Sequence, residues 1–162
     1  MVTGMSTYTL VHVAISLVGI ISGLVVAYGL LTSKRYDGWT LLFFVTTVAT
    51  DLTGFGFPFR GFTPAIGVGT LSTIVLIAAI AARYAFRLAG AWRWIYVAGA
   101  MIALYFNVFV LIVQSFQKIA ALRALAPTQS EPPFLLAQIA ALLIFLVIGA
   151  VAVRGFRPLA AA

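Results

Sequence analysis

Side chains that could do chemistry are few in this chain, and most stand alone inside long apolar runs. His12 is the single histidine, Asp51 follows a threonine-rich stretch, and Asn107, Gln114 and Gln138 are isolated amides. Ionisable and strongly polar groups are costly inside a membrane, so residues of this kind mark candidate sites for a proton, an ion or a polar ligand. We take these five as the predicted pocket residues.

Helical spacing places small and polar residues together on one face of three segments. Residues seven apart, or at i, i+4, i+7 and i+11, share a face of an α-helix. The three faces comprise His12, Ser16, Gly19 and Gly23; Thr47, Asp51 and Gly54; and Gly99, Ala103, Asn107, Val110 and Gln114. Such faces are expected to pack inward in a membrane bundle. Their convergence would form an outward-opening polar pocket, with Arg60, Lys118 and Glu131 at its mouth.

Each pocket residue also has a purely structural explanation. Asp51 has two explanations. It is a structural acid, held neutral or hydrogen-bonded to Thr47, Thr50 or a partner helix, or it is a binding group for a proton, cation or ligand. His12 fits a solvated or hydrogen-bonded histidine, with a metal or haem ligand as the alternative. The amides fit interhelical hydrogen bonds, worth about 0.6 kcal/mol each, as well as contacts to a ligand.

The residue inventory excludes several kinds of site. The chain has no cysteine and one histidine, which excludes disulfides, thiolate metal sites, Fe–S clusters and bis-histidine haem ligation within one chain. The sequence has no catalytic triad in a recognisable context, no paired carboxylates on one helix and no glycine-rich phosphate loop. It therefore does not support an enzyme, and it identifies no cofactor and no metal site.

Composition assigns these residues to a membrane. Of 162 residues, 64% are hydrophobic and 8% are charged, whereas soluble domains are about 45–50% apolar and about 25% charged. The net charge of +7 would suggest nucleic acid in a soluble domain. Here the basic residues fall in short gaps between apolar runs, so we interpret them as determinants of membrane orientation and expect no nucleic-acid partner.

Five stretches approach the roughly 20 apolar residues that cross a bilayer. They are residues 8–31, 40–57, 65–86, 94–117 and 134–153, which predicts one all-α membrane domain, a bundle of five transmembrane helices over residues 1–162. The second stretch is the shortest and carries Asp51. Residues 56–64, with two prolines and two glycines, separate it from the third. In the four-span alternative, residues 51–64 would be re-entrant.

The longest connection, residues 118–133, has two parts. Residues 118–126 are good helix formers, so they extend the fourth helix or lie along the membrane interface. Pro127 ends that segment. Ser130 is the expected N-cap of the fifth helix, followed by Glu131 and two prolines.

Basic residues divide unequally between the two sides of such a bundle. One side receives Lys34, Arg35, Arg83, Arg87, Arg93, Arg154 and Arg157, and the other receives Arg60, Lys118 and Arg123. Because Lys and Arg resist translocation, we expect the N-terminus outside and the C-terminus inside, in the inner (plasma) membrane of a bacterium-like cell. The first span is expected to remain uncleaved.

The leading functional hypothesis is a small multi-pass protein whose outward-facing pocket binds or passes a small ligand or ion, or a small subunit of a larger membrane complex. One alternative is a membrane-embedded redox component that handles a quinone or haem. A second is a purely structural or assembly subunit. The expected partners are the lipid bilayer and either further copies of the chain or a larger complex.

In length and number of predicted spans, the chain is similar to the tryptophan-rich sensory (translocator) proteins, five-helix membrane proteins that bind porphyrins and sterols. The tryptophan- and proline-rich motifs of that family are missing, and Trp39, Trp92 and Trp94 all lie at one predicted interface. No residue role is carried over from this resemblance.

Overall fold

The computed structural model describes residues 6–58, 61 and 64–157, and every regular element in them is helical. In chain order the elements are α1 (Thr7–Leu31), α2 (Asp37–Phe55), α3 (Pro64–Ile80), the π-helical turn η1 (Ala81–Ala85), α4 (Trp92–Lys118), α5 (Ala120–Leu125) and α6 (Pro132–Gly155). The all-α class is confirmed, and each of the five predicted segments is a helix.

Four of these helices are long and apolar enough to cross a membrane: α1, α3 together with η1, α4, and α6. This number and length of apolar helices is the architecture of a membrane protein. The remaining long helix, α2, has 19 residues but contains two aspartates and several threonines. By length and composition alone, α2 is therefore not counted as a span.

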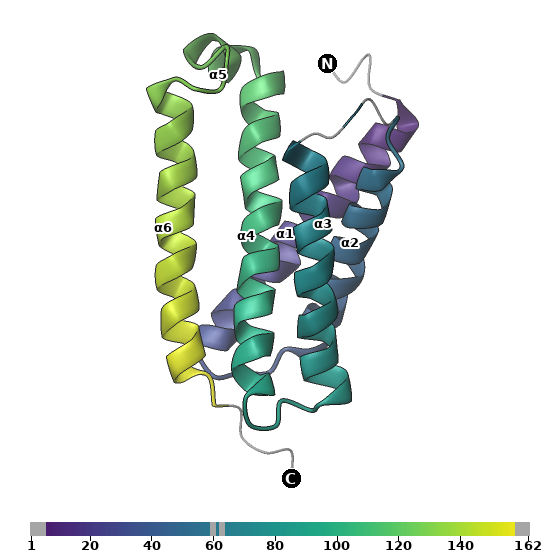
Figure 1. The fold of residues 1–162 in the computed structure, drawn as a ribbon, viewed down its shortest axis with the longest axis vertical. Coiled ribbons are helices and arrows are strands. Elements are labelled where there is room, and N and C mark those ends of the chain that lie inside the picture. The colour runs from purple at the N-terminus through teal and green to yellow at the C-terminus, as the bar shows by residue number, and fades with distance from the viewer. Residues whose placement is uncertain (1–5, 59–60, 62–63, 158–162) are drawn as a thin grey trace.

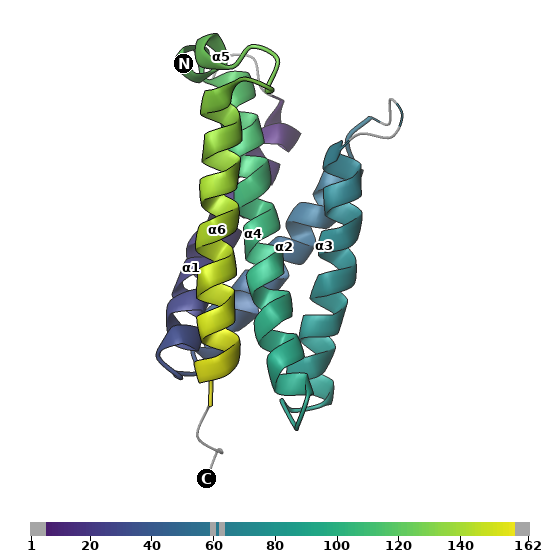
Figure 2. The same ribbon diagram turned by 60° about the vertical axis from the view of Figure 1, so that its left-hand side comes forward.

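Successive long helices run antiparallel, and the views in Figures 1 and 2 agree on their arrangement. In Figure 1, α6, α4, α3 and α2 stand side by side, and α1 crosses behind them at an angle. Helix α4 packs against α1, α3 and α6, while α2 packs against α1 and α3. Helix α6 contacts only α4 and α1 among the well-populated helix pairs, so most of its surface faces outward. The central helix α4 thus organises the bundle.

The apolar core lies along α4 and the inner faces of its neighbours. Tyr96, Val97 and Leu104 of α4 are almost fully buried, as are Phe43 of α2 and Leu76 of α3. Lipid tails supply no hydrophobic drive to bring helices together, so close packing through small residues contributes much of the attraction between them. The core follows that rule where α3 and α4 meet.

Gly99 lets α3 and α4 approach closely. A Cβ at position 99 would lie 2.9 Å from the Cβ of Ala79 and 3.3 Å from the carbonyl oxygen of Val75. Neither atom belongs to a flexible side chain, so neither can rotate out of the way. This contact fixes the spacing between the two helices.

The connection before α6 differs in detail from the prediction. Residues 118–126 do not simply extend α4, since Ile119 is extended and the short helix α5, which has no buried residue, follows it. The N-cap of α6 is Glu131 rather than Ser130, because Pro132 already begins the helix. Proline is well suited to the first helical position, where its missing N–H is not needed.

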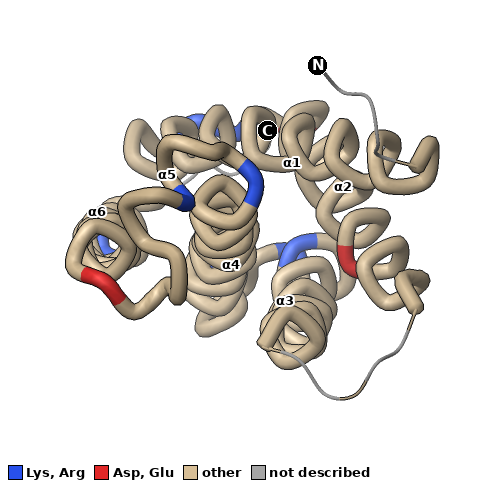
Figure 3. Tube along the Cα trace, turned by 90° about the horizontal axis from the view of Figure 1, so that it is seen from above, with Lys and Arg blue, Asp and Glu red and all other residues tan. Residues whose placement is uncertain are grey.

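Charged residues are sparse along the trace when the bundle is seen from above (Figure 3). We call the end where α1 and α6 finish and α2 and α4 begin the basic end. It carries Lys34, Arg35, Arg83, Arg87, Arg93, Arg154 and Arg157. The described basic residues at the opposite end are Lys118 and Arg123. The fold therefore separates these residues as the antiparallel order of the predicted helices requires.

Replacing Gly99 with alanine should destabilise the bundle, because the added methyl group must push α3 away from α4. We expect a loss of about 1–3 kcal/mol in the free energy of unfolding, as is typical of overpacking. Denaturant unfolding in mixed micelles measures it. Gly149→Ala is the matched control, since its Cβ would meet only the Cβ of Met101, at 3.9 Å. Equal losses in the two variants would contradict the role assigned to Gly99.

Candidate functional site

Three helices meet at a buried polar contact in the middle of the bundle. The amide Nδ2 of Asn107 on α4 donates a hydrogen bond to Oγ1 of Thr47 on α2, at 3.2 Å. A Cβ at Gly19 of α1 would lie 3.4 Å from the same Thr47 oxygen and 3.7 Å from the Asn107 amide nitrogen. One residue from each of the three small-and-polar faces predicted from the sequence therefore lies at this contact.

Asp51 lies one helical turn beyond Thr47 but faces α3. Its side chain is buried, with 9% of the residue exposed, and its Oδ2 is 3.4 Å from Oγ1 of Thr73. The hydroxyl of Ser72 lies beside the same carboxyl group, and its buried oxygen has no hydrogen-bond partner among the described residues. Asp51 takes part in neither of the ion pairs found in the described part of the chain, both of which belong to Asp37.

His12 links α1 to α2 near the end opposite to the basic end. Its Nδ1 is 2.7 Å from Oγ1 of Thr53, and its ring packs edge-on against Phe57. The Thr53 hydroxyl donates its proton to the carbonyl of Ala49, at 2.6 Å, so its oxygen accepts from Nδ1–H of His12. This arrangement supports the hydrogen-bonded alternative for His12. Across residues 6–58, His12 and Asp51 share no hydrogen bond or ion pair.

The two predicted glutamines lie apart from this interior. Gln138 of α6 is buried, and its Nε2 donates to the carbonyl oxygen of Phe109 on α4 at 3.3 Å. Its buried Oε1 has no partner among the described residues. Gln114 is half-buried, and its side chain makes no hydrogen bond within the described ranges. Gln138 therefore ties α6 to α4, as expected of an interhelical amide.

Two of the three predicted mouth residues lie at the end opposite to the basic end. Lys118 is the exposed last residue of α4, and Glu131 accepts hydrogen bonds from the Thr128 backbone, the Thr128 hydroxyl and the Ser130 backbone, at 2.9–3.1 Å. Desolvation acts to raise the pKa of Glu131, but these hydrogen bonds outweigh it and hold the pKa below its usual value of 4.5. Arg60 lies outside the described residues.

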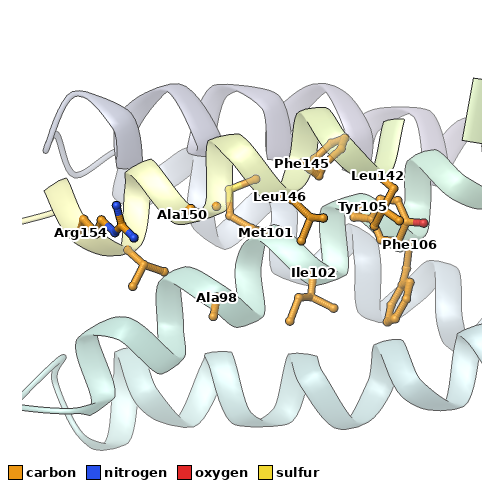
Figure 4. Close-up of a pocket in the computed structure, with 12 residues that line it drawn as sticks. Ala98, Met101, Ile102, Tyr105, Phe106, Leu142, Phe145, Leu146, Ala150 and Arg154 are labelled. Carbon is orange, nitrogen blue, oxygen red and sulfur yellow. The ribbon is translucent and has the colours of Figure 1, made fainter. Parts of the chain in front are cut away.

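A groove that the sequence did not predict lies between α4 and α6 (Figure 4). It has a volume of about 520 Å³ and an almost wholly apolar lining. Arg154 lies at one end, and Tyr105 and Phe106 lie at the other. The lining residues are Ala98, Met101, Ile102, Tyr105, Phe106, Leu142, Phe145, Leu146, Gly149, Ala150, Val153 and Arg154. None of the predicted pocket residues is among them. The sequence feature that could have indicated the groove is the pair of small residues Gly149 and Ala150 within an apolar helix.

Arg83 is more than the orientation determinant that the sequence suggested. It is 6% exposed, and its guanidinium forms an ion pair with Asp37 and lies 5.1 Å from the ring centre of Tyr96. It belongs to η1, the π-helical turn that follows α3. Asp37 could have indicated this ion pair from the sequence, because it is the one acidic residue near the basic residues of this end.

The polar interior can offer hydrogen bonds and one carboxyl group, but it offers no obvious metal centre. No group of three His, Asp or Glu side chains that could hold a metal ion occurs in the described residues. The structure brings Asn107 together with the Thr47 face of α2, and places His12, Asp51 and Gln138 at three further contacts. The carboxyl group of Asp51 is the member of this set that lacks a strong partner.

Comparison with known proteins gives no assignment: no family model, no curated protein and no solved structure matches the chain. Function is therefore argued from the geometry of the bundle.

Glu131→Gln should lower the thermal stability at pH 7 but have little effect in acid. The depressed pKa means that the ionised carboxylate stabilises the folded state above the unfolded pKa, and that this contribution is lost as the pH falls through the folded pKa. Melting curves of both proteins in detergent between pH 7 and pH 3 test this. Lys118→Gln is the control at the same end. Identical curves for wild type and Glu131→Gln at pH 7 would contradict the prediction.

Proposed function

We propose that the chain is a five-span protein of the inner membrane, with its N-terminus outside and its C-terminus inside, whose buried Asp51 reversibly binds a proton or a small cation. The observation that carries this proposal is a buried carboxyl group that faces hydroxyl oxygens and has no basic partner among the described residues.

The packing of α2 supports a fifth span despite its polar content. Thr40, Thr47 and Asp51 are buried, whereas large apolar residues of the same helix, such as Leu41 and Val45, are exposed. Its polar groups thus face protein and its apolar groups face outward, which is the distribution that a hydrocarbon environment requires. Helix α2 also runs alongside α1 and α3 (Figure 1).

The separation of charge supports the orientation. The basic end carries most of the lysine and arginine residues, and basic loops are retained in the cytoplasm. Tryptophans 39, 92 and 94 also belong to elements that begin at this end, where indole rings favour the membrane interface.

Reporter fusions after Tyr36 and after Leu125 test both the number of spans and the orientation. Tyr36 lies between α1 and α2 at the basic end, and Leu125 ends α5 at the opposite end. We expect cytoplasmic reporter activity at the first site and extracytoplasmic activity at the second. Activity on the same side at both sites would exclude five spans, and activity on exchanged sides would exclude the orientation.

The hydrogen bonds around Asp51 favour a group that holds a proton or a cation. The single proton of the Thr73 hydroxyl has two acceptors within reach, the carbonyl of Gly69 at 2.9 Å and Oδ2 of Asp51 at 3.4 Å. The shorter bond to Gly69 leaves the Asp51 carboxyl without a strong donor from Thr73. A bare carboxylate in a medium of low polarity is costly unless a proton, a cation or a basic side chain neutralises it. Carboxylate and hydroxyl oxygens are also ligands for hard cations.

The position of Asp51 favours access from outside. It lies about 21 Å along α2 from Asp37, at 1.5 Å per residue, and Thr53 and its partner His12 follow it toward the opposite end. Toward the basic end, Phe43, Phe44 and Leu76 fill the interior. Because these bulky side chains are almost fully buried, we favour binding from the outer side over passage across the membrane.

Infrared difference spectra of the protein in lipid nanodiscs test the proposed role of Asp51. Titration from acid to alkaline buffer should change the carbonyl band of one buried carboxylic acid, in addition to the bands of the other two acidic side chains, Asp37 and Glu131. Asp51→Asn should abolish that change, because the amide cannot exchange the charge, while Glu131→Gln, which also removes one carboxyl group, should retain it. A midpoint that moves with Na⁺ concentration would identify a cation that competes with the proton.

Two results would contradict this proposal. The first is a wild-type spectrum without a titrating buried carboxyl band. The second is a band that persists in Asp51→Asn. Either would leave Asp51 as a structural acid. The folding control is the helical circular dichroism of the variant, which should match that of the wild type.

A further inference from the structure

We infer that the groove between α4 and α6 binds one acyl chain of an anionic phospholipid, with the phosphate at Arg154. This inference does not depend on the proton or cation site, because the groove lies on another face of α4 and shares no residue with it. Four features of the groove carry it: its length, its lining, the charge at its end and the space beside Gly149.

The length of the groove matches one leaflet. Its α6 wall runs from Leu142 to Arg154, which is about 18 Å at 1.5 Å per residue. Half of a bilayer core about 30 Å thick measures about 15 Å. A ligand that fills the groove therefore belongs to the leaflet at the basic end, and a lipid chain has the required length and direction.

The lining selects an apolar and flexible occupant. Met101, Ile102 and Leu146 form its walls. The aromatic ring of Tyr105, tilted against Phe145 with 5.8 Å between ring centres, closes its far end. The volume of about 520 Å³ is within the range of about 300–1,000 Å³ that is usual for small-molecule sites. Gly149 leaves the floor open, because a Cβ there would meet only Met101.

The charge at the basic end of the groove selects the head group. Arg154 is exposed and makes no hydrogen bond or ion pair with the described residues. By contrast, the guanidinium of Arg93 at the same end donates hydrogen bonds to the carbonyl oxygens of Val153 and Phe156. Trp94 lies one turn before Ala98 on the same face of α4 and is 49% exposed, so its indole is placed at the level of head groups. A free guanidinium beside an apolar groove matches a phospholipid whose acyl chain lies in the groove and whose phosphate lies at the guanidinium.

Lipid titration of the purified full chain, followed by native mass spectrometry, tests the inference. Phosphatidylglycerol and phosphatidylcholine with the same acyl chains serve as probes. We expect one phosphatidylglycerol to be retained per chain, with an affinity about fivefold above that of phosphatidylcholine, as one basic side chain near a lipid surface provides. Arg154→Gln should remove this preference, whereas Arg157→Gln, which removes a charge outside the lining, should preserve it.

Filling the groove gives an independent test. Gly149→Leu should abolish retention of both lipids, and Gly149→Ala should preserve it, because the small methyl group leaves most of the volume open. Ala150→Leu, at an exposed lining residue, tests the same volume if Gly149→Leu does not fold. The comparison of the two lipids on the wild-type chain needs no variant.

Three outcomes would overturn the inference. Equal retention of the two lipids by the wild type would exclude selection of the anionic head group. Retention that falls equally in Arg154→Gln and Arg157→Gln would indicate a diffuse attraction to the basic end. A wild-type dimer that becomes a monomer in Gly149→Leu, without any change in bound lipid, would identify a second copy of the chain as the occupant.

Discussion

The structure depends on covering the polar face of α2. Helix α2 carries two aspartates and several threonines, and the polar side chains that it buries contact other protein groups. Thr47 is met by α4 and Asp51 by α3, while Thr53 is met by α1. Helices α1, α3 and α4 thus each cover part of the polar face of α2, whereas α6 stays at the edge of the bundle, where Gln138 is hydrogen-bonded to α4.

The sequence predicted the helices well because its apolar runs are long and are separated by prolines, glycines and basic residues. It also predicted the meeting of Gly19, Thr47 and Asn107, since spacing alone defines a face of a helix. The partner of Asp51 was not predictable in the same way. Helix α3 is apolar almost all around, so its rotation, and hence the direction of Ser72 and Thr73, is set by the close contact between Gly99 and Ala79.

The groove escaped prediction for a different reason. A cavity between two apolar helices arises from their tilt and from the sizes of the facing residues, and neither leaves a periodic signal. Arg154 was interpreted through its effect on orientation, and the sequence offered nothing to distinguish it from Arg93. Only the fold shows that the guanidinium of Arg93 is hydrogen-bonded at the end of α6, whereas that of Arg154 lies free beside the groove. The chain thus combines a polar interior in one half with an apolar recess in the other.

The links at the basic end have a mechanical consequence. Arg83 joins η1 to Asp37 at the start of α2, Arg93 holds the end of α6, and the Ser33 hydroxyl donates to the carbonyl of Gly155. Each long helix, or the turn next to it, is linked to a neighbouring element by a side chain at this end. A long helix therefore cannot separate from its neighbours at the basic end without breaking one of these side-chain links.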